Sequence, residues 1–280
     1  ERAKKHYGAD RIGLFLGTTT SGIGTTEAAY RQASGGALPD WFDYERTHDY
    51  FSVAGYVRRR LGVWGPAWVL STACSSSAKV FASAARAIAA GFCDAAIVGG
   101  IDSLCLTTLY GFHSLQLVSA RPCRPADSDR DGLSIGEAAG FALVTPTGDE
   151  RSDRPRVLGW GESSDAYHMA SPEPEGYGAA RAMSAALERA QRRPEATPAS
   201  STKGWTGHTL GAAGIVETVI ALLAVTRDWL PHSLNTEHLD PQIRSRILLE
   251  PHSAHTHYVC VNSFGFGGSN CSLIIGSADA

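Results

Sequence analysis

Short apolar runs alternate with helix-forming stretches along this 280-residue chain, and this pattern constrains the fold most strongly. The runs at residues 12–16, 67–70, 95–98 and 140–144 have the length of single strands and are almost continuously apolar. Strands of this kind are typical of a sheet that helices cover on both faces. The sequence therefore predicts an α/β protein with a largely buried sheet.

The same order of elements returns in the second part of the chain. Residues 157–160 are predicted as a strand, 178–191 and 210–227 as helices, and 258–261 and 271–275 as strands on either side of a glycine turn. Residues 71–74, before the first central helix, resemble residues 201–204, before the second. We interpret this as a duplicated α/β unit, with halves 1–150 and 151–280 that meet in the polar stretch 148–155.

Composition and charge exclude several classes of protein. With 43% hydrophobic and 19% charged residues the chain is not disordered, and its net charge of −3 gives no general affinity for nucleic acid. The arginines at 58–60 are read as a solvated helix face. The charged N-terminal residues and the lack of 18 uninterrupted apolar residues predict no signal peptide, no membrane span and a cytoplasmic location.

Six cysteines stand at positions 74, 93, 105, 123, 260 and 271, without a Cys-x-x-Cys pair or a regular spacing. They indicate neither a disulfide framework nor a zinc site.

One of the six cysteines, Cys74, differs from the rest in its surroundings. Cys74 follows an apolar strand and precedes an alanine-rich helix predicted over residues 78–90, with Gly91 just beyond its end. The free N–H groups of a helix start favour a thiolate, so we predict a nucleophile with a lowered pKa.

A nucleophile needs an acid–base partner, and His208 is the best-placed of the ten histidines. It begins an apolar helix among glycines, which would allow a ligand or another backbone to come close. Lys203, five residues earlier, could set the local charge or simply be a surface lysine.

The glycine turn at residues 262–270 carries Phe264, Gly265 and Phe266. Such a turn can supply backbone N–H donors for an oxyanion and an aromatic gate, or it can be a plain hairpin with packed phenylalanines. Its spacing is not that of a dinucleotide or P-loop motif.

Two stretches contain residue types that can bind metal ions. Residues 127–132 begin like a calcium loop, but its twelfth position is Ala138 rather than a bidentate acid. His252, His255 and His257 are too irregularly spaced to be ligands on one helix face and are read as a solvated strand edge. No metal site is predicted.

Taken together, the motifs at 72–76, 201–203, 207–214 and 262–268 resemble those of the β-ketoacyl-acyl-carrier-protein synthases, the condensing enzymes of fatty-acid and type II polyketide pathways. Residues 121–132 and 163–169 follow the same family in order. The resemblance implies the thiolase-like αβαβα fold of two related halves, usually a homodimer, and no cofactor. Residues 134–140 and 204–206 resemble most closely the ketosynthases of aryl-polyene pathways.

The resemblance also implies roles for individual residues. Cys74 would accept an acyl group from acyl carrier protein, and His208 would stabilise the enolate formed from malonyl thioester. The backbone N–H groups of Cys74 and Phe264 would form the oxyanion hole. The turn made of Phe264, Gly265 and Phe266 would be the gating loop, in which Phe264 closes the pocket. Lys203 and Glu217 would be the supporting charged residues.

The sequence departs from the family in two places. It contains no His-Gly-Thr motif, which normally carries a second catalytic histidine, because residue 193 runs almost directly into 199–203. The family's N-terminal segment is also absent before Glu1. We therefore expect a fold that lacks an N-terminal and an internal segment. Three activities stay open: a condensing enzyme, a non-catalytic or impaired partner subunit that shapes chain length, and a cysteine hydrolase.

Overall fold

The computed structural model describes residues 1–148, 154–193 and 197–280. Within these ranges the strands form a four-stranded sheet of order β2-β1-β3-β4, a three-stranded sheet of order β5-β9-β8 and a small β6-β7 pair. The strands are β1 (Ile12–Gly17), β2 (Ala67–Leu70), β3 (Ala95–Asp102), β4 (Ala138–Val144), β5 (Arg156–Ser164), β6 (Trp229–Leu230), β7 (His252–Ser253), β8 (Tyr258–Gly265) and β9 (Ser269–Gly276).

The α-helices of the described residues vary from single turns to four turns. They are α1 (Arg2–Tyr7), α2 (Ile23–Arg31), α3 (Tyr44–Thr47), α4 (Phe51–Leu61), α5 (Ser76–Ala89), α6 (Leu106–Ser114), α7 (Tyr177–Arg189), α8 (Lys203–Thr206) and α9 (Ala213–Arg227). Short 3₁₀ turns are η1 (Ala9–Arg11), η2 (Leu210–Ala212) and η3 (Phe266–Gly268).

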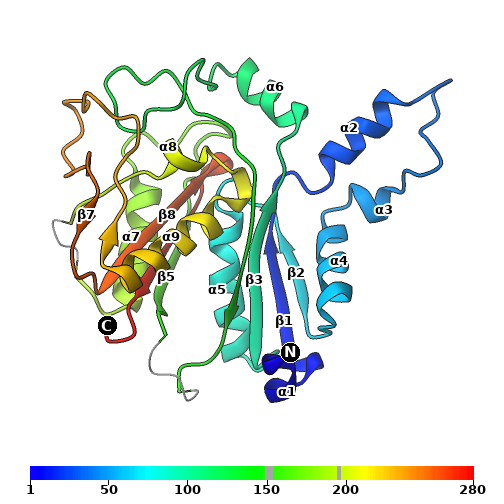
Figure 1. Cartoon of the computed structure of the whole chain (residues 1–280), viewed down its shortest axis with the longest axis horizontal. Coiled ribbons are helices and arrows are strands. Elements are labelled where there is room, and N and C mark those ends of the chain that lie inside the picture. Colours follow the sequence, from blue (N-terminus) through cyan, green and yellow to red (C-terminus); the bar gives the residue numbers. More distant parts are fainter. Residues whose placement is uncertain (149–153, 194–196) are drawn as a thin grey trace.

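The two main sheets lie on either side of α5 and α9, as Figure 1 shows. Helix α4 packs on the outer face of the first sheet and α7 on the outer face of the second. The order α4, sheet, α5 with α9, sheet, α7 gives five layers. This is the αβαβα arrangement predicted from the sequence.

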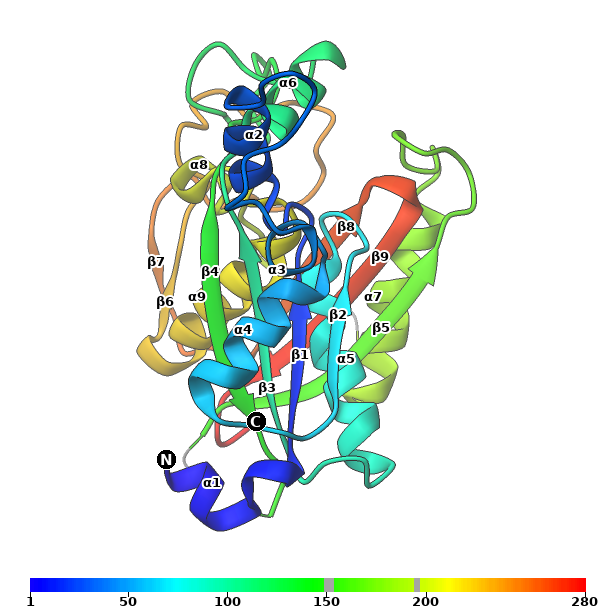
Figure 2. The same ribbon diagram turned by 90° about the vertical axis from the view of Figure 1, so that its right-hand side faces the viewer.

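Strand direction brings the functional motifs to one end of the first sheet. β1 pairs in parallel with both β2 and β3, whereas β4 runs antiparallel to β3, and β9 runs antiparallel to β5 and β8. Carboxyl ends of parallel strands meet at one edge, where α/β proteins usually bind ligands. In Figure 2 the segments that follow β1 and β3, including α2 and α6, lie at that end, and both termini lie toward the other.

Every strand predicted from the sequence is present, and most extend a few residues further than the apolar run alone suggested. The helix expected at 78–90 begins two residues earlier, and the one expected at 178–191 ends at Arg189. The proposed boundary at 148–155 falls mostly on residues 149–153, outside the described ranges. The division into two related halves therefore stays a prediction.

Helices α5 and α9 form the centre of the core because their small residues let them pack closely. A Cβ atom added to Gly214 would lie 2.4 Å from the backbone nitrogen of Ala78, so only glycine fits there. The segment Leu210–Arg227 is long and apolar enough to cross a membrane by composition, yet 56% of it is buried inside the molecule. This burial between the two sheets explains its apolar character as that of a core helix.

Ile215 tests how much this central layer contributes to stability. Its side chain is fully buried in the core, so Ile215→Ala should lower the free energy of unfolding by about 2–5 kcal/mol. Val219→Ala, on the same helix but 38% exposed, is the matched control and should cost far less. Urea denaturation measures both, and equal losses for the two variants would contradict the layered core described above.

Candidate active site

Cys74 lies in the tight turn that joins β2 to α5. Ser76 begins α5, and its hydroxyl donates to the Ala73 carbonyl at 2.6 Å and accepts from the Thr72 N–H at 2.9 Å. Ala73 has a φ of 50°, a left-handed conformation that costs a non-glycine residue about 1–3 kcal/mol. The turn is therefore a strained one, held by local hydrogen bonds that fix the direction of the thiol.

His208 faces this thiol from the opposite half of the chain. Its Nε2 lies 2.9 Å from the Cys74 sulfur, and its side chain is almost fully buried. The His208 N–H donates to the Ser134 carbonyl at 2.7 Å, and its carbonyl accepts from the Gly136 N–H at 3.0 Å. The structure thus brings together the two residues that the sequence predicted as nucleophile and partner.

Burial controls the protonation of this pair. It lowers the pKa of His208 to about 4, with a smaller contribution from the Lys203 charge, so the imidazole is neutral at neutral pH. Burial also raises the pKa of Cys74 above the ordinary thiol value, although the Phe266 N–H and the Lys203 charge oppose this. The predicted lowering of the Cys74 pKa is therefore wrong, because desolvation of the thiolate outweighs the effect of the helix start.

Lys203 and Glu217 form an ion pair next to the thiol and the imidazole. Lys203 begins α8 and Glu217 belongs to α9, and the Ser263 hydroxyl donates to Glu217 at 3.5 Å. The charge on Lys203 lowers the pKa of both Cys74 and His208. Lys203 therefore acts on the pair electrostatically and is not a solvated surface lysine.

The glycine turn acts on the Cys74 thiol through its backbone. The N–H group of Phe266 lowers the pKa of Cys74, and the N–H group of Cys74 itself adds a smaller effect in the same direction. Phe264 lies within β8, opposite Asn270, and its side chain is 43% exposed. Phe266 begins η3, where the strand pairing has ended, so its N–H group is a further candidate donor beside that of Phe264. The oxyanion role stays a prediction.

Phe112 is an aromatic neighbour of the site that the sequence did not reveal. Its ring stacks on Phe266 with centroids 5.4 Å apart and meets the His208 ring edge-on at 6.4 Å. It comes from α6, and no local pattern marks it among the apolar residues of that helix. Phe112 and Phe266 thus form an aromatic pair beside His208.

Asp102 holds the strand ends on which the site is built. This carboxylate is 2% exposed and accepts four hydrogen bonds from the loop after β1, two from backbone N–H groups and two from hydroxyls. Its second oxygen accepts from the Ala212 N–H at 3.0 Å. Asp102 is the last residue of β3 and directly follows an apolar run. An acid at the end of a buried strand is the sequence feature that could have identified it.

Hydrogen bonds explain the acidic stretch at residues 127–132, which begins like a calcium loop. Asp127, Asp129 and His238 lie close enough to share an ion. However, the buried Asp127 carboxylate already accepts hydrogen bonds from the N–H groups of Asp129, Glu237 and His238, and these lower its pKa to about 2. These bonds account for the carboxylate without an ion.

Comparison with known families decides the family of the chain. Residues 2–150 match the N-terminal domain of β-ketoacyl synthases, and residues 192–237 match their C-terminal domain. The chain belongs to the β-ketoacyl synthase family.

Individual relatives agree with this membership. A 3-oxoacyl-[acyl-carrier-protein] synthase 2 of Rhizobium meliloti is 34% identical over 79% of this chain, which spans only 63% of that relative. One from Vibrio harveyi is 31% identical over 95% of this chain and 75% of the relative. A ketosynthase (ApeO) solved in complex with its chain length factor (ApeC) from Xenorhabdus doucetiae superposes with a TM-score of 0.89 at 36% identity, covering 99% of this chain and 77% of that one. The thiolase-like fold of these ketosynthases is thus confirmed.

The raised pKa of Cys74 predicts slow alkylation at neutral pH. Iodoacetamide labelling of Cys74, followed by peptide mass spectrometry, should accelerate with pH through a midpoint above that of a free thiol. Lys203→Met should slow labelling further, because it removes the charge that favours the thiolate. Lys5→Met, which removes an exposed cation on α1, is the control and should change nothing. Fast labelling that does not depend on pH would show instead a preformed thiolate.

The lowered pKa of His208 predicts acid sensitivity. Its value in the folded state, about 4, lies below the ordinary 6.5, so the unfolded chain binds the proton more tightly. The contribution of neutral His208 to the free energy of unfolding is fully present above pH 6.5. It is lost as the pH falls toward 4, and the loss amounts to about 3 kcal/mol.

Urea titrations across this pH range test the linkage. The His208→Gln variant should lose less of its free energy of unfolding on acidification than the parent, since Gln binds no proton. His113→Gln, which removes an exposed histidine of α6, should keep the full dependence. An identical pH slope for parent and His208→Gln would rule out the buried neutral imidazole.

Proposed function

We propose that this chain is a β-ketoacyl-acyl-carrier-protein synthase, which performs decarboxylative Claisen condensation on carrier-protein thioesters in fatty-acid or polyketide biosynthesis. One observation carries the proposal: a cysteine sulfur 2.9 Å from a buried imidazole, with two backbone N–H groups beside it, in a chain of this family. Cys74 and His208 are the proposed catalytic residues, and Lys203 with Glu217 is the proposed supporting ion pair.

In the first half-reaction the Cys74 sulfur bonds to the acyl carbon and the carrier thioester C–S bond breaks. The Cys74 proton leaves with the carrier sulfur, and the N–H groups of Cys74 and Phe266 donate to the oxyanion that forms meanwhile. Because Cys74 rests as a thiol, its proton must be moved during attack. His208 is the nearest side chain that can take it.

In the second half-reaction malonyl thioester loses carbon dioxide, and the electron pair of the broken bond forms an enolate. The enolate carbon attacks the acyl carbon on Cys74, and the cysteine sulfur leaves as a thiolate, which takes up a proton from solvent to restore the resting thiol. A neutral imidazole carries one N–H, so His208, with its pKa of about 4, suits donation to the enolate oxygen. No step requires a metal or redox cofactor.

A specific observation favours a second candidate, an impaired or non-catalytic partner subunit. The sequence lacks the His-Gly-Thr motif that carries the family's second catalytic histidine. The similar ketosynthase from Xenorhabdus doucetiae is found with a chain length factor. The retained Cys74 favours at least the first half-reaction, so acylation can survive where condensation is lost.

The names of the relatives support acyl carrier protein as the partner that delivers both thioesters. We further propose that the chain pairs with a second copy or with a related synthase subunit, that it is cytoplasmic, and that its pathway is of the aryl-polyene kind. The match to a ketosynthase solved with such a subunit supports the heterodimer.

Intact-protein mass spectrometry after incubation with acyl-loaded carrier protein tests the first half-reaction. The parent should gain the mass of one acyl group, and Cys74→Ala should gain none. Cys260→Ala removes an exposed thiol and should acylate like the parent.

The products formed after addition of malonyl-loaded carrier protein distinguish the proposed synthase from an impaired or non-catalytic subunit and from a hydrolase. A β-ketoacyl thioester supports the synthase, whereas an acyl adduct that never turns over supports the impaired subunit. No adduct would favour the non-catalytic partner, and release of free acid would make the chain a hydrolase.

A further inference from the structure

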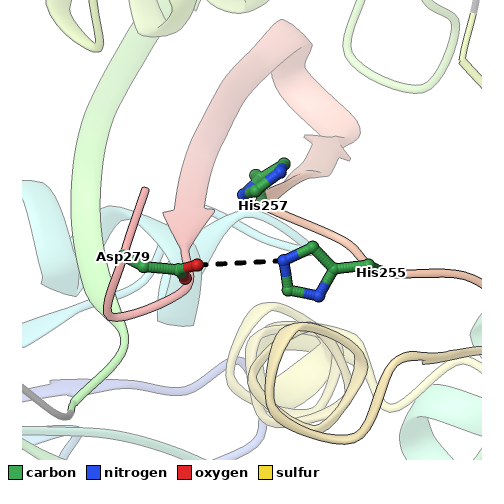
Figure 3. A group of neighbouring side chains, drawn as sticks. All are labelled: His255, His257 and Asp279. Atoms are coloured by element: carbon green, nitrogen blue, oxygen red, sulfur yellow. Dashed lines mark ion pairs between the residues drawn. The ribbon is translucent and has the colours of Figure 1, made fainter.

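Three side chains converge at the start of β8, away from Cys74. His255 and His257 stand two residues apart on the segment that leads into β8, and Asp279 follows β9. Figure 3 shows the three side chains together, with the His255 Nε2 lying 3.8 Å from the Asp279 carboxylate. One ligand atom from each residue lies within 4.8 Å of the other two.

A fourth residue orients His255. The Asp228 carboxylate at the end of α9 lies 3.0 Å from the Nδ1 of His255. A proton on Nδ1 leaves Nε2 with its lone pair directed at Asp279 and His257. A carboxylate behind an imidazole in this way is the arrangement that supports most metal-bound histidines.

Backbone hydrogen bonds hold the participating segments. The Ala254 N–H donates to the Asp228 carbonyl at 3.1 Å, which attaches the loop to α9. The Ser277 N–H donates to the His257 carbonyl at 2.8 Å, which attaches the tail beside the same loop. The group is therefore assembled by contacts that need no ion.

The donor set selects a class of metal. Two imidazoles and one carboxylate suit zinc and similar divalent transition metals, whereas calcium and magnesium require oxygen ligands. Zinc bonds of 2.0–2.1 Å in tetrahedral geometry put ligand atoms about 3.4 Å apart. The His255–Asp279 separation of 3.8 Å is close to this, and the other two pairs of ligand atoms lie within 4.8 Å. Small side-chain movements would bring all three to bonding geometry, since His255 and Asp279 are more than half exposed.

We propose that His255, His257 and Asp279 bind one divalent transition-metal ion of the zinc type, with Asp228 as the positioning residue and a water at the fourth position. The ion joins the tail after β9 to the loop before β8. Since β8 extends from Tyr258 to Gly265, roughly 25 Å of strand separate this ion from the loop that contains Phe266. The ion's role is to fasten the tail, and it is independent of the proposed condensation.

Calorimetric titration of chelator-treated protein with Zn²⁺ tests the proposal. The parent should bind one equivalent in the micromolar range or tighter. His257→Ala and Asp279→Asn should weaken binding at least tenfold, and Asp228→Asn should weaken it about tenfold through loss of orientation. His252→Ala, which removes a neighbouring histidine outside the group, is the matched control and should bind like the parent.

Co²⁺ as a probe distinguishes this site from the free thiols. Bound cobalt should show a visible d–d spectrum without a thiolate charge-transfer band, and the spectrum should be unchanged in Cys74→Ser. Far-UV circular dichroism checks that each variant is folded. The proposal is overturned if no saturable binding is found, if folded His257→Ala binds like the parent, or if binding disappears with Cys74.

Discussion

The buried carboxylate of Asp102 connects the parts on which the site depends. It accepts hydrogen bonds from the loop after β1 and from η2 just before α9, while it belongs itself to the end of β3. A buried carboxylate without such partners would cost several kcal/mol, so all five donors must be in place together. This requirement joins the first sheet to the helix that follows His208. Asp102 thus fixes the loop after β1 and the start of α9, while local hydrogen bonds of Ser76 hold the turn that carries Cys74.

Local patterns predicted the α/β class and the pairing of Cys74 with His208, whereas the five-layer arrangement was implied by the resemblance to a known family. Apolar runs of strand length and an alanine-rich helix depend on neighbouring residues only. Asp102 and Phe112 were missed because their contacts join distant segments, and the pKa of Cys74 was misjudged because burial is a property of the whole fold. The N–H group of Phe266 adds a candidate donor for a similar reason, since the point where β8 ends sets which N–H groups are free of strand pairing.

The electrostatics of the site favour a resting state without net charge on the reacting pair. The thiol and the imidazole are both neutral, and the nearby positive charge of Lys203 is balanced by Glu217. A neutral pair avoids the cost of burying two ions in a dry pocket. Charge then develops only during reaction, beside donors already in position. This arrangement suits stabilisation of a transition state better than storage of a reactive thiolate.

The close approach of Gly214 to the Ala78 backbone has a geometric consequence. Because a main chain meets a glycine there, the separation of α5 and α9 is set by backbone packing rather than by side-chain size. The thiol and the imidazole lie just before these two helices, so their separation depends on the same contact. Phe112 and Phe266, by contrast, touch each other through their rings, and substitution can change the size of those rings.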